Sequence, residues 1–282
     1  MYSFGILVGL TSSLTLVFRA STIKDTKLST NQLNLLYRVI ATPIFGFILY
    51  IYNVNPLVVA DGFWFYYLAL LAVNYLFSHL QVRALHKYSF SNVTVFEPLT
   101  MVFGGILSYF FLGEHLAPLQ YLGMLIVALA FVYLVYTEKS ITLNSQILRD
   151  MLILYVTVSI VHALAKQAVL LSSSMIVTFY QVFLVGVLFA VTTAFAGEKL
   201  YRFKDLKTNK NIVALAILHL VGFGLLTYTY RVLPLSIVVT LLAIRPFISL
   251  LLSQIKYREK NIKYKFIAAC IAFLGVLVIA FG

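Results

Sequence analysis

The chain has 282 residues, of which 62% are hydrophobic and only 11% are charged, and its mean hydropathy is +0.97. These values exclude an ordinary soluble globular protein and predict a chain that lies almost wholly within a bilayer. The formal net charge of +12 would suggest nucleic acid in a soluble protein. Here the positions of the basic residues have a membrane explanation, and no nucleic-acid partner is expected.

Ten apolar segments follow one another along the chain, each of about 18 to 24 residues and long enough to cross a hydrocarbon core of about 30 Å. The connections between them are mostly too short to hold a folded soluble domain. We therefore predict an all-α integral membrane protein with ten transmembrane helices, at 2–19, 32–53, 62–84, 89–112, 117–136, 150–170, 174–196, 212–230, 235–255 and 264–281.

The basic residues are distributed unevenly over the connections. Sixteen of the 21 Lys and Arg residues lie in or beside the odd-numbered connections; the exceptions are Arg19, Arg38, Lys166, Arg231 and Arg245. Since cytoplasmic loops carry an excess of Lys and Arg, this pattern predicts a multi-pass protein of the cytoplasmic membrane with the odd connections inside and both termini outside.

An internal repeat relates the two halves of the chain. The segment RALHKYSFSNVTVFEPLTMV, which begins at residue 83, aligns with RVLPLSIVVTLLAIRPFISL, which begins at residue 231, and the alignment pairs Pro98 with Pro246. Each half holds five spans, an odd number, so the second half must enter the membrane in the opposite sense to the first. We predict two inverted five-helix repeats, residues 1–140 and 141–282.

The same alignment places Glu97 opposite Arg245, each directly before its matched proline. An unpaired arginine at the centre of a transmembrane helix costs about 2.5 to 3.5 kcal/mol, so we expect Arg245 to face the interior with Glu97 as its partner. Pro98 and Pro246 are predicted to break their helices and free backbone groups for a ligand. The two charges would bind substrate, or Glu97 would carry a coupling proton; the alternative is a purely structural salt bridge between spans four and nine.

Polar side chains on other spans are further candidates for substrate binding or coupling. Ser159, His162 and Lys166 share one face of the sixth span, where they would donate to an anionic ligand or form a proton relay through His162. The alternative for Lys166 is that it snorkels to the headgroups. For the remaining candidates the alternative is a hydrogen bond to a neighbouring helix, worth about 0.6 to 2 kcal/mol; they are Asn74 and Tyr75 on the third span, and Arg38 and Gln181 at nearly matching places in the two halves.

With these features the chain resembles the drug/metabolite transporter superfamily, specifically its EamA-like members, over its whole length. The most specific part is FEPLTMVFGGILSYFFLGEHLAPLQYLGMLIVALAFVYLV, with a proline in the fourth span, Gly113 and Glu114 at its end, and Gln120 and Gly123 opening the fifth. The basic residues Arg19, Arg38 and Lys166 are also similar to the family pattern. The second half departs from it, because YREKNIKYKF stands where the family usually shows a Gly-Glu turn, with Glu259 as its remnant.

The resemblance implies a basket of ten helices, the fifth and tenth packing as a peripheral pair, with no metal or organic cofactor. It implies a secondary transporter for a small polar metabolite such as an amino acid or amine, often coupled to a proton or to exchange. We expect a monomer or a homodimer. Many members have both termini in the cytoplasm, opposite to the charge-based prediction. The alternatives are a flippase for a lipid-linked sugar or amine, and a non-transporting receptor or assembly factor. The sequence contains no H-E-x-x-H, G-x-S-x-G or Walker A motif, so an enzyme is not expected.

Overall fold

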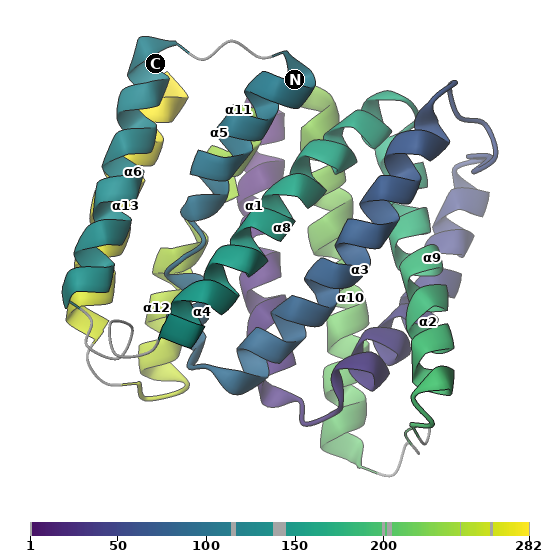
Figure 1. Ribbon diagram of the computed structural model, residues 1–282. Helices are drawn as coiled ribbons and strands as arrows, with labels where there is room; N and C mark the ends of the chain where they lie inside the picture. The colour runs from purple at the N-terminus through teal and green to yellow at the C-terminus, as the bar shows by residue number, and fades with distance from the viewer. Residues whose placement is uncertain are drawn as a thin grey trace. The chain divides into compact units, whose positions relative to one another are not determined.

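The computed structural model describes residues 2–113, 117–137, 145–198, 201, 205–242, 244–259 and 262–281. Within these ranges every regular element is a helix (Figure 1). The helices are α1 (Tyr2–Asp25), α2 (Thr30–Ile51), α3 (Phe63–Lys87), α4 (Phe90–Thr94), α5 (Leu99–Leu112), α6 (Pro118–Thr137), α8 (Ser145–Leu170), α9 (Ser174–Phe195), α10 (Leu206–Val232), α11 (Leu235–Leu242), α12 (Arg245–Ile255) and α13 (Ile262–Phe281).

Among the described residues, seven helical segments are long and apolar enough to cross a membrane, and they coincide with predicted spans one to four and six to eight. The other three predicted spans coincide with α6, with α11 and α12 together, and with α13. The first span was predicted too short. The helix continues beyond Arg19 to Asp25, since the intervening residues are compatible with a helix and Lys24 in the last turn suits its negative end.

The starts of several helices are fixed by short polar side chains. Ser29, Ser89 and Ser173 each accept a hydrogen bond from the backbone amide three residues later, at 3.1 to 3.3 Å, and so cap α2, α4 and α9. Asp205 does the same for α10. Hydrogen bonds from the Thr208 side chain and backbone lower the pKa of the Asp205 carboxyl below its usual value.

The chain forms two compact units, each containing parts of both predicted repeats. Unit 1 comprises Met1–His86 and Leu164–Val232, and unit 2 comprises Lys87–Ala163 and Leu233–Gly282. In unit 1, α1 packs against α10, while α2 packs against both α9 and α10. A compact unit and a sequence repeat are different divisions of the chain, so the predicted repeats 1–140 and 141–282 stay a prediction.

Unit 2 holds the two interrupted helices and a tightly packed pair. The segments α4 and α12 pack together, as do α5 and α11, and α6 runs alongside α13 (Figure 1). The α6–α13 contact depends on Gly275. A Cβ atom built there would lie 2.7 Å from the Gly123 carbonyl oxygen, closer than real Cβ contacts, and 3.0 Å from the Ile126 Cβ, tighter than most of them.

Gly275→Ala is therefore expected to destabilise the protein by about 1 to 3 kcal/mol, because backbone as well as side-chain atoms must move apart. Gly224→Ala is the matched control, since no atom lies within 4 Å of its Cβ position and alanine gains about 0.5 to 1 kcal/mol over glycine within a helix. Thermal unfolding of the purified protein in detergent should give a lower Tm for the first variant only. An unchanged or higher Tm for Gly275→Ala would contradict the close packing.

Large apolar side chains lie on the outside of the helices. Phe65 and Phe195 expose 75% and 89% of their surface, and Phe47, Tyr50 and Phe110 are also strongly exposed. So many exposed large apolar side chains are unusual in a soluble monomer but are stable against lipid chains. The exposed surface therefore agrees with the composition in placing this chain in a membrane.

Candidate functional site

The helix that carries Glu97 is interrupted between α4 and α5. Pro98 has no backbone N–H, so it cannot donate to the Thr94 carbonyl as the next residue of a continuous helix would. The amide of Glu97 donates to Thr94 instead, at 3.1 Å, and further tight turns lead into α5, with the amide of Leu99 donating to Phe96 at 3.0 Å. The carbonyl of Val93 is thereby left without its usual helical donor.

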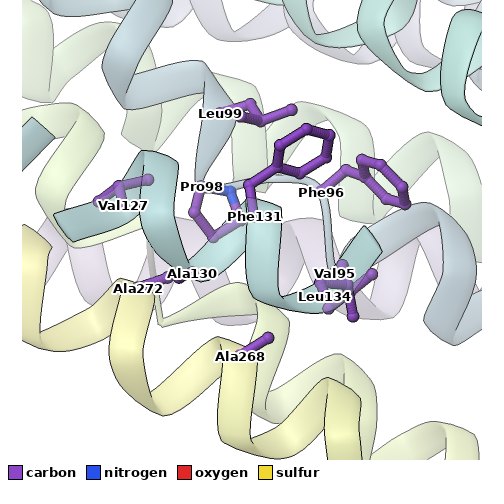
Figure 2. A pocket seen from close by; sticks show the side chains of 10 residues that line it. All are labelled: Val95, Phe96, Pro98, Leu99, Val127, Ala130, Phe131, Leu134, Ala268 and Ala272. Carbon is purple, nitrogen blue, oxygen red and sulfur yellow. The ribbon is translucent and has the colours of Figure 1, made fainter. Parts of the chain in front are cut away.

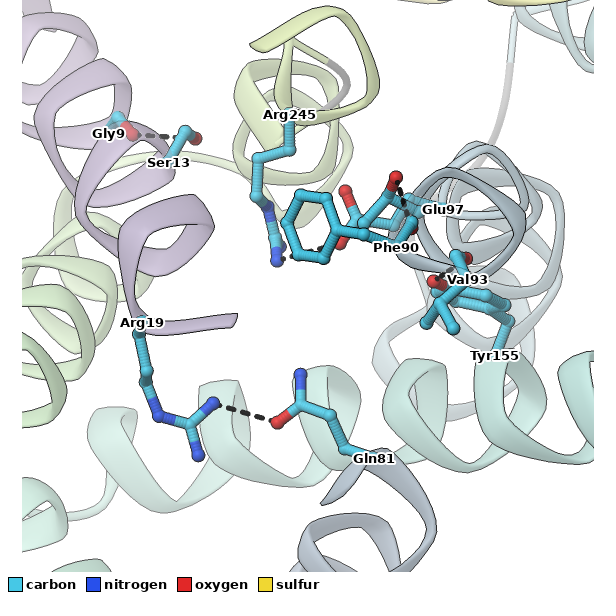
Figure 3. Close-up of polar contacts among 10 residues, drawn as sticks. Gly9, Ser13, Arg19, Gln81, Phe90, Val93, Glu97, Tyr155 and Arg245 are labelled. Atoms are coloured by element: carbon cyan, nitrogen blue, oxygen red, sulfur yellow. Dashed lines mark hydrogen bonds and ion pairs between the residues drawn. The ribbon is translucent and has the colours of Figure 1, made fainter. Parts of the chain in front are cut away.

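Helix α8 supplies the missing donor. The Tyr155 hydroxyl donates to the Val93 carbonyl at 2.6 Å (Figure 3). The Ser159 hydroxyl donates to the Thr100 carbonyl at 3.2 Å and also to the Tyr155 carbonyl of its own helix. Both side chains are buried. Two hydroxyl groups of α8, one turn apart, thus hold the interrupted segment from both of its sides.

The second interruption lies between α11 and α12. Helix α11 ends at Leu242 and α12 begins at Arg245, with Pro246 in its first turn. A proline is tolerated there because the first amides of a helix have no intrahelical partner. The two matched prolines therefore stand at the starts of two helical segments, α5 and α12.

Glu97 and Arg245 form an ion pair within unit 2, with 3.5 Å between Arg245 Nη1 and Glu97 Oε1 (Figure 3). The pairing predicted from the aligned repeats is confirmed; a role in transport stays a prediction. The pair is not saturated: Glu97 Oε2 and Arg245 Nε have no hydrogen-bond partner among the described residues, nor does the hydroxyl of Ser249, one turn further along α12. The side chains keep 18% and 15% of their surface exposed.

A small cavity lies beside the first interruption (Figure 2). Its volume is about 10 Å³, close to the space of a single water molecule. Apolar side chains line it, among them Val95 and Phe96 from the interruption, Phe131 from α6 and Ala268 from α13. This cavity is too small for a metabolite, and Glu97 does not line it.

The polar residues predicted on the sixth span are buried in α8. Ser159 and His162 belong to unit 2, and Lys166 belongs to unit 1. The Ser159 hydroxyl donates to backbone carbonyls, as described above. Only 8% of the Lys166 surface is exposed, which does not support the alternative in which its ammonium group lies among the headgroups.

In unit 1, Arg38 is almost completely buried, with 1% of its surface exposed. Its Nη1 atom donates to the Asn34 carbonyl at 3.0 Å and to Asn34 Oδ1 at 2.6 Å, and Nη2 donates to Ser78 Oγ at 2.9 Å. The guanidinium also lies over the rings of Tyr37 and Phe189, at 4.6 and 5.3 Å. Arg38 is thus positioned by α2, α3 and α9 together.

The other candidates of unit 1 are buried beside or near this arginine. The Tyr75 ring centroid lies 4.6 Å from that of Phe189, so Tyr75 and Arg38 both contact one phenylalanine. Asn74 and Gln181 are buried, and Gln181 Oε1 has no hydrogen-bond partner among the described residues.

Three important residues were missed by sequence reasoning. Tyr155 precedes Ser159 by one helical turn, and Asn34 precedes Arg38 by the same interval, so the helical spacing of polar groups was the available signal. His219 of α10 had no such signal. Its place beside the Tyr37 ring, with 5.0 Å between centroids, follows only from the packing of α10 against α2.

Glu259 acts as a cap despite the departure from the family turn. Its carboxylate accepts hydrogen bonds from the amides of Phe90 and Ser91, at 2.8 and 3.2 Å, and so anchors the start of α4. Arg258 stands where the family's glycine would be and adopts a left-handed backbone with φ of 51°, a conformation that costs a non-glycine residue about 1 to 2 kcal/mol. In the first half, Gly113 of the family's Gly-Glu turn adopts the same left-handed conformation, with φ of 65°. Glu114 and the Gln120 side chain lie outside the described residues.

Comparison with known proteins identifies the family. The model of the EamA-like transporter family matches residues 1–136 and again residues 150–281. No curated protein matches the chain. Several chains of known structure are similar; one crystal structure matches with a TM-score of 0.72 at 16% sequence identity, over 98% of this chain and 96% of that one, which shows a shared fold alone. Because the family's model covers nearly the whole sequence, the chain belongs to the EamA-like transporter family of membrane proteins.

Proposed function

We propose that the protein is a secondary active transporter that moves a small polar metabolite, such as an amino acid or an amine, across the cytoplasmic membrane by alternating access. The observation that carries this proposal is the unsaturated Glu97–Arg245 pair beside two interrupted helices. Charged side chains in membrane helices are costly and mark substrate or ion pathways. Broken helices with free polar groups are the usual place for a transporter's binding site.

An inverted repeat of ten spans is part of this proposal. The family model matches once in each half of the chain. The helix contacts agree with such a repeat, in which α4, α5 and α6 of the first half correspond to α11, α12 and α13 of the second. The α4–α12 contact then corresponds to the α11–α5 contact, and the α5–α6 contact to the α12–α13 contact. Each half has an odd number of predicted spans, so equivalent helices would run in opposite directions across the bilayer. The uneven loop charges favour odd connections in the cytoplasm and both termini outside.

The chemistry of the pair suggests how binding and coupling would occur. Arginine stays protonated, so Arg245 would bind a carboxylate while Glu97 would bind an ammonium group, and a zwitterion would satisfy both. In a proton-coupled cycle, protonation of Glu97 would weaken its hold on Arg245 and free the guanidinium for substrate. Alternating access requires only that this pair faces each side of the membrane in turn.

A flippase for a lipid-linked sugar or amine is the second candidate. A hollow of about 820 Å³ lies between α12 and α13, and its wall includes Leu250, Leu251 and Phe266, with Glu259 and Lys263 as charged groups. An acyl chain would fit such an apolar wall. The transporter of water-soluble metabolites ranks first because neither Glu97 nor Arg245 lines this hollow. A non-transporting receptor is disfavoured because the pair does not satisfy its own hydrogen-bonding groups.

Uptake into proteoliposomes tests the proposal. Purified protein is reconstituted and supplied with a mixture of amino acids, amines and nucleotide sugars, with and without a pH gradient, and the vesicle contents are read by mass spectrometry. At least one polar metabolite should accumulate above protein-free vesicles, and accumulation that requires the gradient identifies proton coupling. Headgroup translocation of lipid-linked sugars without uptake of any soluble compound would replace the proposal by the flippase. Activity in neither assay would overturn it.

A further inference from the structure

Unit 1 buries two arginines in the interior of its helices. Arg19 of α1 and Arg38 of α2 expose 2% and 1% of their surface, and each lies more than one turn inside its helix. Arginine cannot lose its proton in such a site. Two permanent positive charges are therefore buried among apolar helices. Burying each charge costs free energy unless a group of opposite charge lies beside it.

No carboxylate in the part of the chain that the structure describes compensates them. Among the described residues, neither arginine forms an ion pair with any Asp or Glu. The Arg19 guanidinium donates to Gln81 Oε1 at 2.8 Å and to the Tyr37 hydroxyl at 3.3 Å, both of which are neutral. Arg38 is bonded to the equally neutral Asn34 and Ser78. Each arginine therefore has hydrogen-bond acceptors, but no negatively charged partner among the described residues.

Hydrogen-bond donors are also in excess around the Tyr37 ring. The Nε atoms of Arg19 and Arg38 are buried without a partner among the described residues, and so are both ring nitrogens of His219. All three side chains meet the same ring: the guanidinium carbons lie 5.8 and 4.6 Å from its centroid, and the imidazole centroid lies at 5.0 Å. A neutral histidine always carries one N–H donor. The cluster thus has three unused N–H donors, on Arg19, Arg38 and His219, and only one unused acceptor, the second ring nitrogen of His219.

We propose that this arginine cluster, formed by Arg19, Tyr37, Arg38, Gln81 and His219, binds an oxyanion, a carboxylate or a phosphate group. An oxyanion supplies both the missing negative charge and the missing acceptors, and guanidinium groups bind it with directed, charge-assisted hydrogen bonds. Phe223 and Phe189, each over one guanidinium at 5.6 and 5.3 Å, keep the site apolar around the charges. The identification of this oxyanion as part of the substrate rests on the proposed transport; the binding itself does not.

Ligand protection of the full-length protein in detergent tests the cluster. The probes are inorganic phosphate, succinate and acetate, with choline as the cationic control and phosphatidylglycerol added to the micelles in a separate arm. An oxyanion should raise the Tm, since a ligand of the folded state stabilises it, while choline should not. Protection by soluble anions identifies a water-soluble ligand, and protection only by phosphatidylglycerol identifies a lipid phosphate. No protection by any of these anions would overturn the inference.

Substitutions locate the binding. Arg19→Gln and Arg38→Gln should each lower the affinity for the protecting anion by about 10- to 100-fold, because each removes a charge-assisted hydrogen bond. Lys27→Gln removes one cation from an exposed position in the same unit and should leave the affinity unchanged. Unchanged affinity in both arginine variants would contradict the site.

Gln81→Glu keeps the test valid if an arginine variant fails to fold. The new carboxylate would lie at the 2.8 Å contact with Arg19 and compensate it internally. The variant should show a higher Tm without ligand and at least about tenfold weaker anion binding than the wild type. A lower Tm together with unchanged anion binding would overturn the inference. Anion protection without uptake in vesicles would contradict the proposed transport but not the anion site. Uptake without anion protection would contradict the anion site but not the proposed transport.

Discussion

Glu97→Gln and Arg245→Gln, each made alone, are expected to lower the transport rate by about 100-fold, equivalent to about 2.7 kcal/mol. Each single change leaves one charge without its partner inside the membrane helices. Breaking a fully buried pair costs about 3 to 5 kcal/mol, and the partial exposure of this pair reduces the expected loss of stability to about 1 to 3 kcal/mol. Initial uptake rates in proteoliposomes and Tm values in detergent measure the two effects.

The double variant Glu97→Gln/Arg245→Gln separates the two roles of the pair. With both charges removed, no uncompensated charge remains, so the Tm should return to within about 1 °C of the wild type, as the exchange of a buried pair for neutral groups is often energetically neutral. Transport should stay as low as in the single variants, because the two groups proposed to bind substrate are gone. Recovery of both stability and transport would show a purely structural salt bridge.

Tyr155→Phe is expected to destabilise the protein by about 1 to 3 kcal/mol and to slow transport. The change removes the donor to the Val93 carbonyl and leaves that buried acceptor unsatisfied. It also frees the interrupted segment that carries Glu97. Thermal unfolding and hydrogen exchange of residues 93–101 measure the result, and faster exchange in this segment is expected.

Thr157→Val on the same helix is the control for Tyr155→Phe. The Thr157 hydroxyl donates to the Ile153 carbonyl one turn back, within its own helix, so its loss leaves no interhelical group unpaired. Its Tm should change by less than that of Tyr155→Phe, and hydrogen exchange at residues 93–101 should not change. Equal effects of the two substitutions would show that the Tyr155–Val93 bond does not hold the interruption.

Hydropathy predicts most helix positions in this chain, because a bilayer requires each crossing segment to satisfy its backbone internally over a fixed length. The prolines marked the two interruptions, since the missing N–H and the ring make a continuous helix costly there. The internal alignment predicted the Glu97–Arg245 contact from sequence offset alone. In the proposed inverted repeat, residues at matched depths would meet near the twofold axis.

The other features of the candidate sites depend on packing between helices, which no local sequence pattern predicts. Arg19 and His219 both lie against the Tyr37 ring only because α1 and α2 both pack against α10. The left-handed Arg258 could not be read from the sequence, because the cap made by Glu259 holds a backbone conformation that arginine rarely adopts. Tyr155 looked like one of many aromatic residues, and only the freed carbonyl of Val93 gives its hydroxyl a function.

The central claim is that the region around Glu97 and Arg245 opens to each side of the membrane in turn. A single cysteine at Ser249, in a Cys270→Ser background, reports this directly, because Ser249 lies one turn after Arg245 and is fully buried. A membrane-impermeant thiol reagent is applied to right-side-out and to inside-out vesicles. The account predicts modification from both sides, with rates that shift in opposite directions when substrate is added. Modification from one side only, or from neither, under every condition would contradict it.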